Sequence, residues 1–389
     1  MSILLFVVGI LLFISLVVVH EWGHFIMARR NGVGVEEFGI FFPPRLFKHR
    51  TRGGWDFTIN LLPLGGFVKL KGEHDTDTEK GSYGAAPLWA KTKIMAAGVV
   101  MNLIVAVVLL MIVALVGMPQ LVDNQFTVKS DTHVTRSEVI VSYVEPGSPA
   151  AKAGLKNTDR IESIGTKTTA AQTNTPDKLR AATKRFAGKQ VTITYVRAGE
   201  QHKTTTTLLT NQVVAASDKT SDPKGQLGVV PTAFSLQRST WSAPIVAVGL
   251  TGQFTALTFE GLGKAVAGVG SIVAGAITGN THARQNGQET ASSQVSGPVG
   301  IFVILQDGSL LGYQFMLMII AIISLTLAIM NILPIPALDG GRLWFTLFAR
   351  GVRGRPLTAR REELINGIGF LFLIGLIILI TVVDVHRFF

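Results

Sequence analysis

Two histidines and a glutamate stand within five residues of one another in the stretch HEWGH, as His20, Glu21 and His24. Residues four apart on a helix project from the same face, so both imidazoles can reach one metal ion. Glu21 follows the first histidine, where it can take a proton from a water molecule that the ion activates. The spacing therefore predicts a hydrolytic metal centre, and two core histidines bonded to helix carbonyls are the alternative.

The surroundings of HEWGH favour the metal centre. The motif ends an apolar run that begins at Ile3 and continues at helical spacing to Ile26, which is long enough to span a membrane. The first residues, MSILLF, lack the basic region of a secretory signal, so we expect a retained helix. Ionisable groups inside a membrane helix are costly and are functional by default.

Zinc in a catalytic site needs a third protein ligand and an open position. The chain has no cysteine, so the ligand must be His, Asp or Glu. Asp339 is the most unusual carboxylate, because it follows Pro334 and Pro336 in NILPIPALDGG, where the prolines must interrupt an apolar helix. The alternative for Asp339 is the N-cap of a following short helix. The other six histidines lack a partner at ligand spacing: His49, His74, His133, His202, His282 and His386.

The composition indicates a membrane protein, since 48% of the 389 residues are hydrophobic. Beyond the first span we expect spans at about 94–118, 315–333 and 364–383, which makes four transmembrane helices. The stretch 241–278 is apolar only in patches. It predicts amphipathic helices at the outer membrane surface instead of a fifth span.

Basic residues orient these spans. Eleven Lys and Arg lie between residues 29 and 93, and six Arg lie between the third and fourth predicted spans. Both loops are therefore expected in the cytoplasm, with both termini and the central segment outside. Four spans place His20 and Asp339 at a similar depth near the cytoplasmic side, whereas a fifth span at 241–278 would place them on opposite sides. Most basic clusters flank spans, so we expect no nucleic-acid partner.

The central segment changes character at about residues 125–210, where the alternation in EVIVSYV and QVTITYVRAG predicts strands. The stretch VEPGSPAAKAGLKNTDRIESIGTKT (144–168) resembles the core signature of a PDZ domain of the bacterial protease type, with Thr158 in place of the usual glycine. Such a domain adds an extended peptide or a C-terminus to a sheet edge. A small α/β spacer without a ligand is the alternative.

HEWGH at the end of a first span, NILPIPALDGG at the end of a later span and the PDZ-like insert between them resemble the site-2 protease family, bacterial zinc intramembrane metalloproteases of the RseP type. The resemblance covers nearly the whole chain. It implies that His20, His24 and Asp339 bind Zn²⁺ and that Glu21 is the catalytic base. It also implies that Asn331 helps to hold the substrate or its oxyanion. The alternative for Asn331 is a polar residue that satisfies carbonyls freed by a nearby proline.

Three further stretches carry the resemblance. NLLPLGGFVKL (60–70) resembles a loop that dips into the membrane beside the active site, so Gly65 and Gly66 are expected to contact an extended substrate. A cytoplasmic hairpin is the alternative. AAGVVMN (96–102) resembles the opening of the family's second span, with Val99 where a proline commonly stands. SGPVGI (296–301) resembles the approach to the third span.

The expected fold is a polytopic α-helical membrane protein with four transmembrane helices, an inserted extracytoplasmic α/β PDZ domain and a membrane-associated β-hairpin loop. The expected parts are a first membrane half at 1–120 with a cytoplasmic or re-entrant loop at 31–93, the PDZ domain at 121–235, an amphipathic extracytoplasmic segment at 236–310 and a second membrane half at 311–389.

The resemblance implies a zinc-dependent endopeptidase of the bacterial cytoplasmic membrane, with its active site near the cytoplasmic side. Its partners would be membrane lipid and single-span membrane proteins, such as anti-sigma factors or remnant signal peptides. A catalytically inactive membrane scaffold that displays the PDZ domain is the alternative. The intact Glu21 argues against that alternative, because a scaffold has no use for a base beside two metal ligands.

Overall fold

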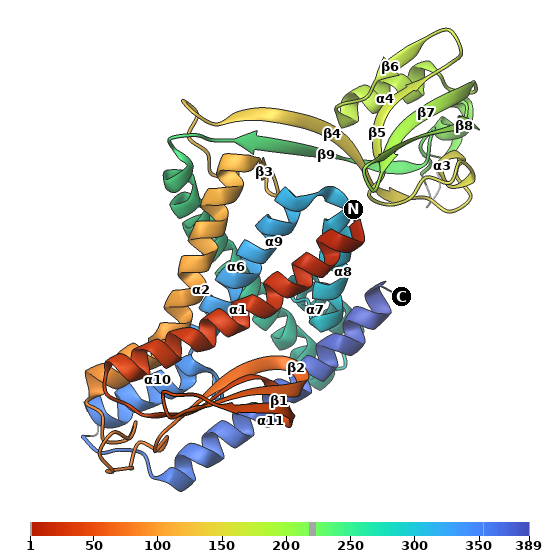
Figure 1. Ribbon diagram of the computed structural model, residues 1–389. Coiled ribbons are helices and arrows are strands. Elements are labelled where there is room, and N and C mark those ends of the chain that lie inside the picture. Colours follow the sequence, from red (N-terminus) through yellow and green to blue (C-terminus); the bar gives the residue numbers. More distant parts are fainter. Residues whose placement is uncertain (1, 218–222, 353, 389) are drawn as a thin grey trace. The chain divides into compact units, whose positions relative to one another are not determined.

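The fold is taken from a computed structural model that describes residues 2–217, 223–352 and 354–388 (Figure 1). The chain divides into two compact units. One consists of residues 1–7, 111–247 and 305–318, and it contains a β domain. The other consists of residues 8–110, 248–304 and 319–389, and it contains the predicted metal ligands.

Long apolar helices are a main feature of the fold (Figure 1). Five helices of the described residues are long and apolar enough to cross a membrane. Many of their apolar side chains are not covered by other described residues, as expected for helices that face lipid. These helices are α1 (Ser2–Arg30), α2 (Leu88–Val116), α6 (Ala243–Thr278), α9 (Tyr313–Ile332) and α11 (Ala359–Phe388). The chain is therefore a multi-pass membrane protein.

The segment 241–278 differs from the prediction. It forms one continuous helix of 36 residues, α6, instead of several amphipathic helices. The polar residues do not break this helix because they find partners along it: the hydroxyl of Thr258 donates to the carbonyl of Phe254, and Glu260 pairs with Lys264 one turn later. The predicted count of four spans is thus not confirmed, since α6 also satisfies the length and composition of a span.

Asp131 fixes the start of α6. Its carboxylate accepts hydrogen bonds from the backbone N–H of Thr240 at 2.7 Å and of Ser242 at 3.0 Å. Partial burial raises the pKa of Asp131, but the hydrogen bonds from Ser242 and Thr240 outweigh it and hold the pKa well below its usual range. The ionised side chain therefore satisfies the N–H of Ser242, directly before the helix, and holds the turn that leads into the helix.

The chain folds back after α6. The polar helix α7 (Thr281–Gln294) runs antiparallel to the second half of α6, and glycines allow the close approach. A Cβ atom on Gly268 would lie 2.8 Å from the carbonyl oxygen of Gly287. The short apolar helix α8 (Pro298–Leu311) then follows, before α9 begins. Two further helices, α7 and α8, stand between α6 and α9 in the chain. The direction in which α9 crosses a membrane therefore does not follow from α6 alone.

The predicted loop after the first span contains a bent β-hairpin, β1 (Val35–Arg50) and β2 (Asp56–Leu70). Residues 37–40 pair on one side with residues 56–59, and residues 35–40 pair on the other side with residues 66–70. Residues 66–70, which we call the edge segment, pair with no other described strand than β1. The hairpin lies along the C-terminal half of α1 (Figure 1). Its association with the membrane remains a prediction.

The inserted domain contains a sheet in the order β3-β9-β4-β5-β7-β8, with β6 paired to β5. The predicted alternation is present in β7, where Val191, Ile193 and Tyr195 point into the core. An inserted α/β domain is thus present, whereas its assignment as a PDZ domain remains a prediction. Its elements are β3 (Met118–Pro119), β4 (His133–Val144), α3 (Pro149–Lys152), β5 (Arg160–Gly165), β6 (Ala170–Gln172), α4 (Pro176–Arg185), β7 (Gln190–Arg197), β8 (Glu200–Thr207), α5 (Asn211–Ser217) and β9 (Val229–Arg238).

Candidate metal centre

Three predicted ligands meet where α1 approaches the start of α10 (Asp339–Leu347). Nε2 of His20 lies 2.8 Å from Oδ2 of Asp339, Nε2 of His24 lies 3.0 Å from the same oxygen, and the two Nε2 atoms are 3.2 Å apart. Tetrahedral zinc with such ligands separates the donor atoms by roughly 3.3 Å. The donor types and their separations therefore fit zinc, and no other such group occurs among the described residues.

The histidines are held by α2 as well as by their own helix. The N–H at Nδ1 of His24 donates to the carbonyl oxygen of Ile94 at 2.7 Å, which leaves Nε2 as the ligand atom. Nδ1 of His20 lies 3.3 Å from the side-chain amide of Asn102. The Oδ1 atom of Asn102 is buried without a partner among the described residues, and an amide turned by 180° would accept the Nδ1–H of His20.

Gly98 gives the histidines the space they need. A Cβ atom at this position would lie 2.4 Å from Nε2 of His24 and 2.6 Å from Nε2 of His20. Ile94, Gly98 and Asn102 follow one another at intervals of four residues, so they share one face of α2. In the sequence, AAGVVMN indicates only a resemblance, and its pattern does not place this face against the ligands. The signal was a glycine and an asparagine four residues apart in an apolar helix.

The turn before α10 aims Asp339 at the histidines. Helix α9 ends at Ile332, two residues before Pro334, as the proline predicts. The chain then bends back so closely that a Cβ atom on Gly341 would lie 2.1 Å from the carbonyl oxygen of Ile335. Leu338 occupies the N-cap position, so Asp339 is not the N-cap that the alternative required. Its carboxylate is left to face His20 and His24.

Glu21 lies between the histidines and the edge segment. Its carboxylate is close enough to His20, His24 and Asp339 to interact with them electrostatically, and the backbone N–H of Val68 donates to it. A Cβ atom on Gly66 would lie 3.2 Å from Cγ of Glu21, so glycine gives the strand room to approach this residue. These contacts place Glu21 beside the ligand cluster without making it a member of the cluster.

The predicted substrate-binding residues lie around the same centre. Gly65 has a φ of +154°, and a Cβ atom there would lie 3.0 Å from the ring of Phe42. Asn331 lies in the last turn of α9 and is half-buried. Among the described residues its side chain makes no hydrogen bond to the carbonyls that Pro334 frees. The carbonyl oxygen of Ile332, four residues before Pro336, accepts a hydrogen bond from Nε1 of Trp344 at 2.9 Å.

Comparison with known proteins agrees with this chemistry. The family model of peptidase family M50 matches residues 8–376. The zinc metalloprotease RasP of Shouchella clausii is 28% identical in an alignment that covers 98% of each chain. The regulator of sigma-W protease RasP of Bacillus subtilis is 26% identical, also over 98% of each chain. The zinc metalloprotease RasP of Bacillus licheniformis shows the same identity and coverage.

Proposed function

The chain belongs to peptidase family M50 and is a zinc metalloprotease of the site-2 protease type, and we propose that it cleaves single-span membrane proteins within or beside their transmembrane segments. The observation that carries this proposal is the position of the ligand cluster. His20 and His24 belong to a helix that is apolar and long enough to span a membrane, so the reacting bond has to reach a site on that helix.

We assign roles to four residues of the centre. His20, His24 and Asp339 would hold the ion. Zinc, when bound, lowers the pKa of a water molecule and polarises the scissile carbonyl. Glu21 accepts the proton of the attacking water and later delivers it to the leaving amine nitrogen. Water and substrate approach from the side of Asp339, whose side chain is 26% exposed, compared with 9% for each histidine.

The edge segment is the proposed binding surface for the substrate. A helical substrate hides its carbonyls in its own hydrogen bonds, so it must unwind before attack. The edge segment can pair with the unwound chain as an added strand, because no described strand covers its outer side. Gly65 and Gly66 keep this approach open beside Glu21, and the side-chain amide of Asn331 is proposed to hold a substrate carbonyl near the ion.

The inserted domain offers a second peptide site. Strand β9 pairs with β3 only at its end, so residues 229–234 have an outer edge that no described strand covers. A groove of about 670 Å³ lies between this edge and α4, and Arg180, Lys184 and Lys224 line it. We propose that the domain is a PDZ domain and binds an extended peptide there, with the basic side chains attracting its terminal carboxylate.

The proposed setting is the cytoplasmic membrane of a bacterium, with the inserted domain outside and the metal centre near the cytoplasmic side. The distribution of Lys and Arg among the loops supports this orientation. The Bacillus subtilis relative is named a regulator of sigma-W protease. By this likeness, a membrane-bound anti-sigma factor is the proposed type of substrate, and remnant signal peptides are a second type.

The test compares wild type with Glu21→Gln. Both proteins are purified in detergent, their bound zinc is measured, and cleavage of a model single-span substrate is followed. We expect one zinc ion in each protein and a loss of roughly 10²–10⁴-fold in cleavage rate for Glu21→Gln, because the carboxamide cannot accept the proton. Equal cleavage by both proteins would refute the role of Glu21. Failure of both proteins to bind zinc would refute the metalloprotease and leave the scaffold.

A further inference from the structure

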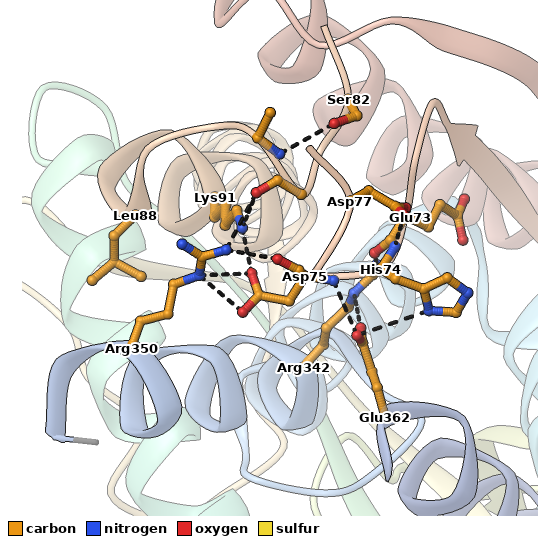
Figure 2. A network of polar contacts seen from close by, with 12 residues as sticks. Glu73, His74, Asp75, Asp77, Ser82, Leu88, Lys91, Arg342, Arg350 and Glu362 are labelled. Atoms are coloured by element: carbon orange, nitrogen blue, oxygen red, sulfur yellow. Dashed lines mark hydrogen bonds and ion pairs between the residues drawn. The ribbon is translucent and has the colours of Figure 1, made fainter. Parts of the chain in front are cut away.

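A network of buried charges involves the residues that come directly after the edge segment in the chain. The network also includes a residue of α10, the helix that carries Asp339 (Figure 2). Asp75 and Lys91 form an ion pair whose side chains are only 3% and 1% exposed. Arg350 lies in the π-helical turn η1 (Phe348–Val352) that continues α10, and its Nε is 2.9 Å from both carboxylate oxygens of Asp75. Two cations from different helices thus converge on one buried carboxylate.

Arg342 forms the second half of the network. It lies three residues after Asp339 in α10, and it donates to the backbone carbonyl of Glu73. Its Nε is 3.4 Å from Oε1 of Glu362 in α11, and Oε2 of Glu362 accepts the backbone N–H of Asp75 at 3.2 Å. The segment 73–75 is therefore held through both its backbone and its side chains (Figure 2).

Tyr83 joins the two halves. Its side chain is fully buried, with Nζ of Lys91 at 5.2 Å and Cζ of Arg342 at 4.7 Å from the ring centroid. Burial raises the pKa of Tyr83 to about 12, so the phenol stays neutral at physiological pH and presents its ring face to both cations. The ring therefore contacts side chains from both the start of α2 and α10.

Both ends of the network lead into the candidate metal centre. The edge segment ends at Leu70, whose N–H donates to the carboxylate of Glu73 at 2.9 Å, so the strand that faces Glu21 continues directly into the clamped segment. On the other side, Asp339 and Arg342 belong to one turn of α10. None of the network residues contacts a predicted metal ligand through its side chain in the described structure.

We propose that Arg342 and Asp75 are positioning residues, which hold α10 and the edge segment in a fixed relation so that the ion and the substrate carbonyl meet. This inference rests on the proposed function. Buried ion pairs add little net stability compared with apolar residues, so stability alone is a weak reason for such a network. The planar guanidinium of Arg342 instead restrains both the distance and the relative orientation of the groups that it contacts. The π-helical turn agrees, because it shifts Arg350 on the helix surface, and such turns are frequent at functional sites.

The test uses Arg342→Gln and the milder Arg342→Lys, which keeps the charge but loses the planar fork. Three quantities are measured in the full-length protein: the zinc dissociation constant by chelator competition, the absorption spectrum of the Co²⁺-substituted protein, and kcat and KM on a single-span substrate. We expect Arg342→Gln to weaken zinc binding about tenfold and to lower kcat about 10–100-fold with KM within about twofold of wild type. The cobalt spectrum should change, because Asp339 is no longer held in place.

Arg197→Gln is the matched control, since it removes a bidentate contact of Arg197 with Asp159 at 2.7 Å in the inserted domain. It should leave all three quantities unchanged. If Arg342→Gln does not fold, Arg342→Lys decides the matter, with an expected loss of about threefold to tenfold in kcat. Variants that only lower the unfolding temperature, with wild-type zinc affinity, spectrum and kcat, would overturn the inference. A wild-type protein that neither binds zinc nor cleaves would instead overturn the proposed function.

Discussion

At the scale of single residues, the candidate metal centre depends on side chains that do not bind the ion. His20 and His24 each use Nε2 toward Asp339, and their Nδ1 atoms face Asn102 and the carbonyl of Ile94. A hydrogen bond at Nδ1 fixes the tautomer and the direction of the ring. The affinity of the site for zinc is therefore set partly by α2, which supplies none of the three ligands.

Asn102→Ala tests this dependence. Loss of the amide leaves Nδ1 of His20 without its partner, so we expect zinc affinity to fall about 10–100-fold, measured by competition with a chelator. Ser324→Ala is the matched control, because the Ser324 hydroxyl donates to the backbone carbonyl of Asn102 at 2.8 Å but does not touch the histidine. If both variants bind zinc as tightly as wild type, the side chain of Asn102 has no role in orienting His20.

At the scale of elements, the bent hairpin brings the edge segment of β2 next to Glu21 of α1. Because β1 lies between two parts of β2, the edge segment has one paired side and one side that faces Glu21. The N–H of Val68 points to that outer side, where it donates to the Glu21 carboxylate. An added substrate strand would pair along the same side.

Val68→Pro tests the outer side of the edge segment. Proline removes the N–H that donates to Glu21 and that the ladder with β1 does not use, so the hairpin should persist while both the contact with Glu21 and strand addition weaken. We expect the cleavage rate to fall about 10–100-fold with zinc content unchanged, because a substrate that is held less precisely reaches the reactive geometry less often. Val68→Ala is the control for loss of the side chain and should cleave at close to the wild-type rate. Wild-type cleavage by Val68→Pro would show that the substrate does not pair at this position.

At the scale of the whole molecule, the distribution of basic residues predicts which parts lie on each side of the membrane. Loops between residues 29 and 93 are expected in the cytoplasm, and the inserted domain outside. This orientation follows from charge, whereas the number of spans follows from length and apolarity. The helix α6 has the length and apolarity of a span, where the sequence predicts surface helices.

The absence of cysteine makes the orientation directly measurable, since single cysteines can be introduced into a background without thiols. We expect Lys167→Cys, in an exposed bend of the inserted domain, to react with a membrane-impermeant maleimide in intact cells. Arg52→Cys, in the exposed hairpin turn, should react only after the membrane is opened. Ala106→Cys, buried in α2, is the unreactive control. The reverse pattern for the first two positions would invert the predicted topology.

The sequence by itself determined the features that depend on local periodicity. The four-residue spacing of His20 and His24, the apolar runs and the prolines before Asp339 predict the helices, their breaks and the two ligand motifs. The alternation in the insert predicts its strands. These features follow from the geometry of a single element, so no knowledge of partners in space is required.

Only the tertiary structure decided which elements meet. His20 and Asp339 are 319 positions apart, and their contact depends on how α1 approaches α10. The same holds for Gly98 against the histidines and for Arg342 against Glu73, because packing distance and rotamer are not encoded in periodicity. The continuity of α6 was missed for a related reason: glycine and threonine weaken a helix in isolation, but partners along the helix and tertiary packing outweigh that local preference.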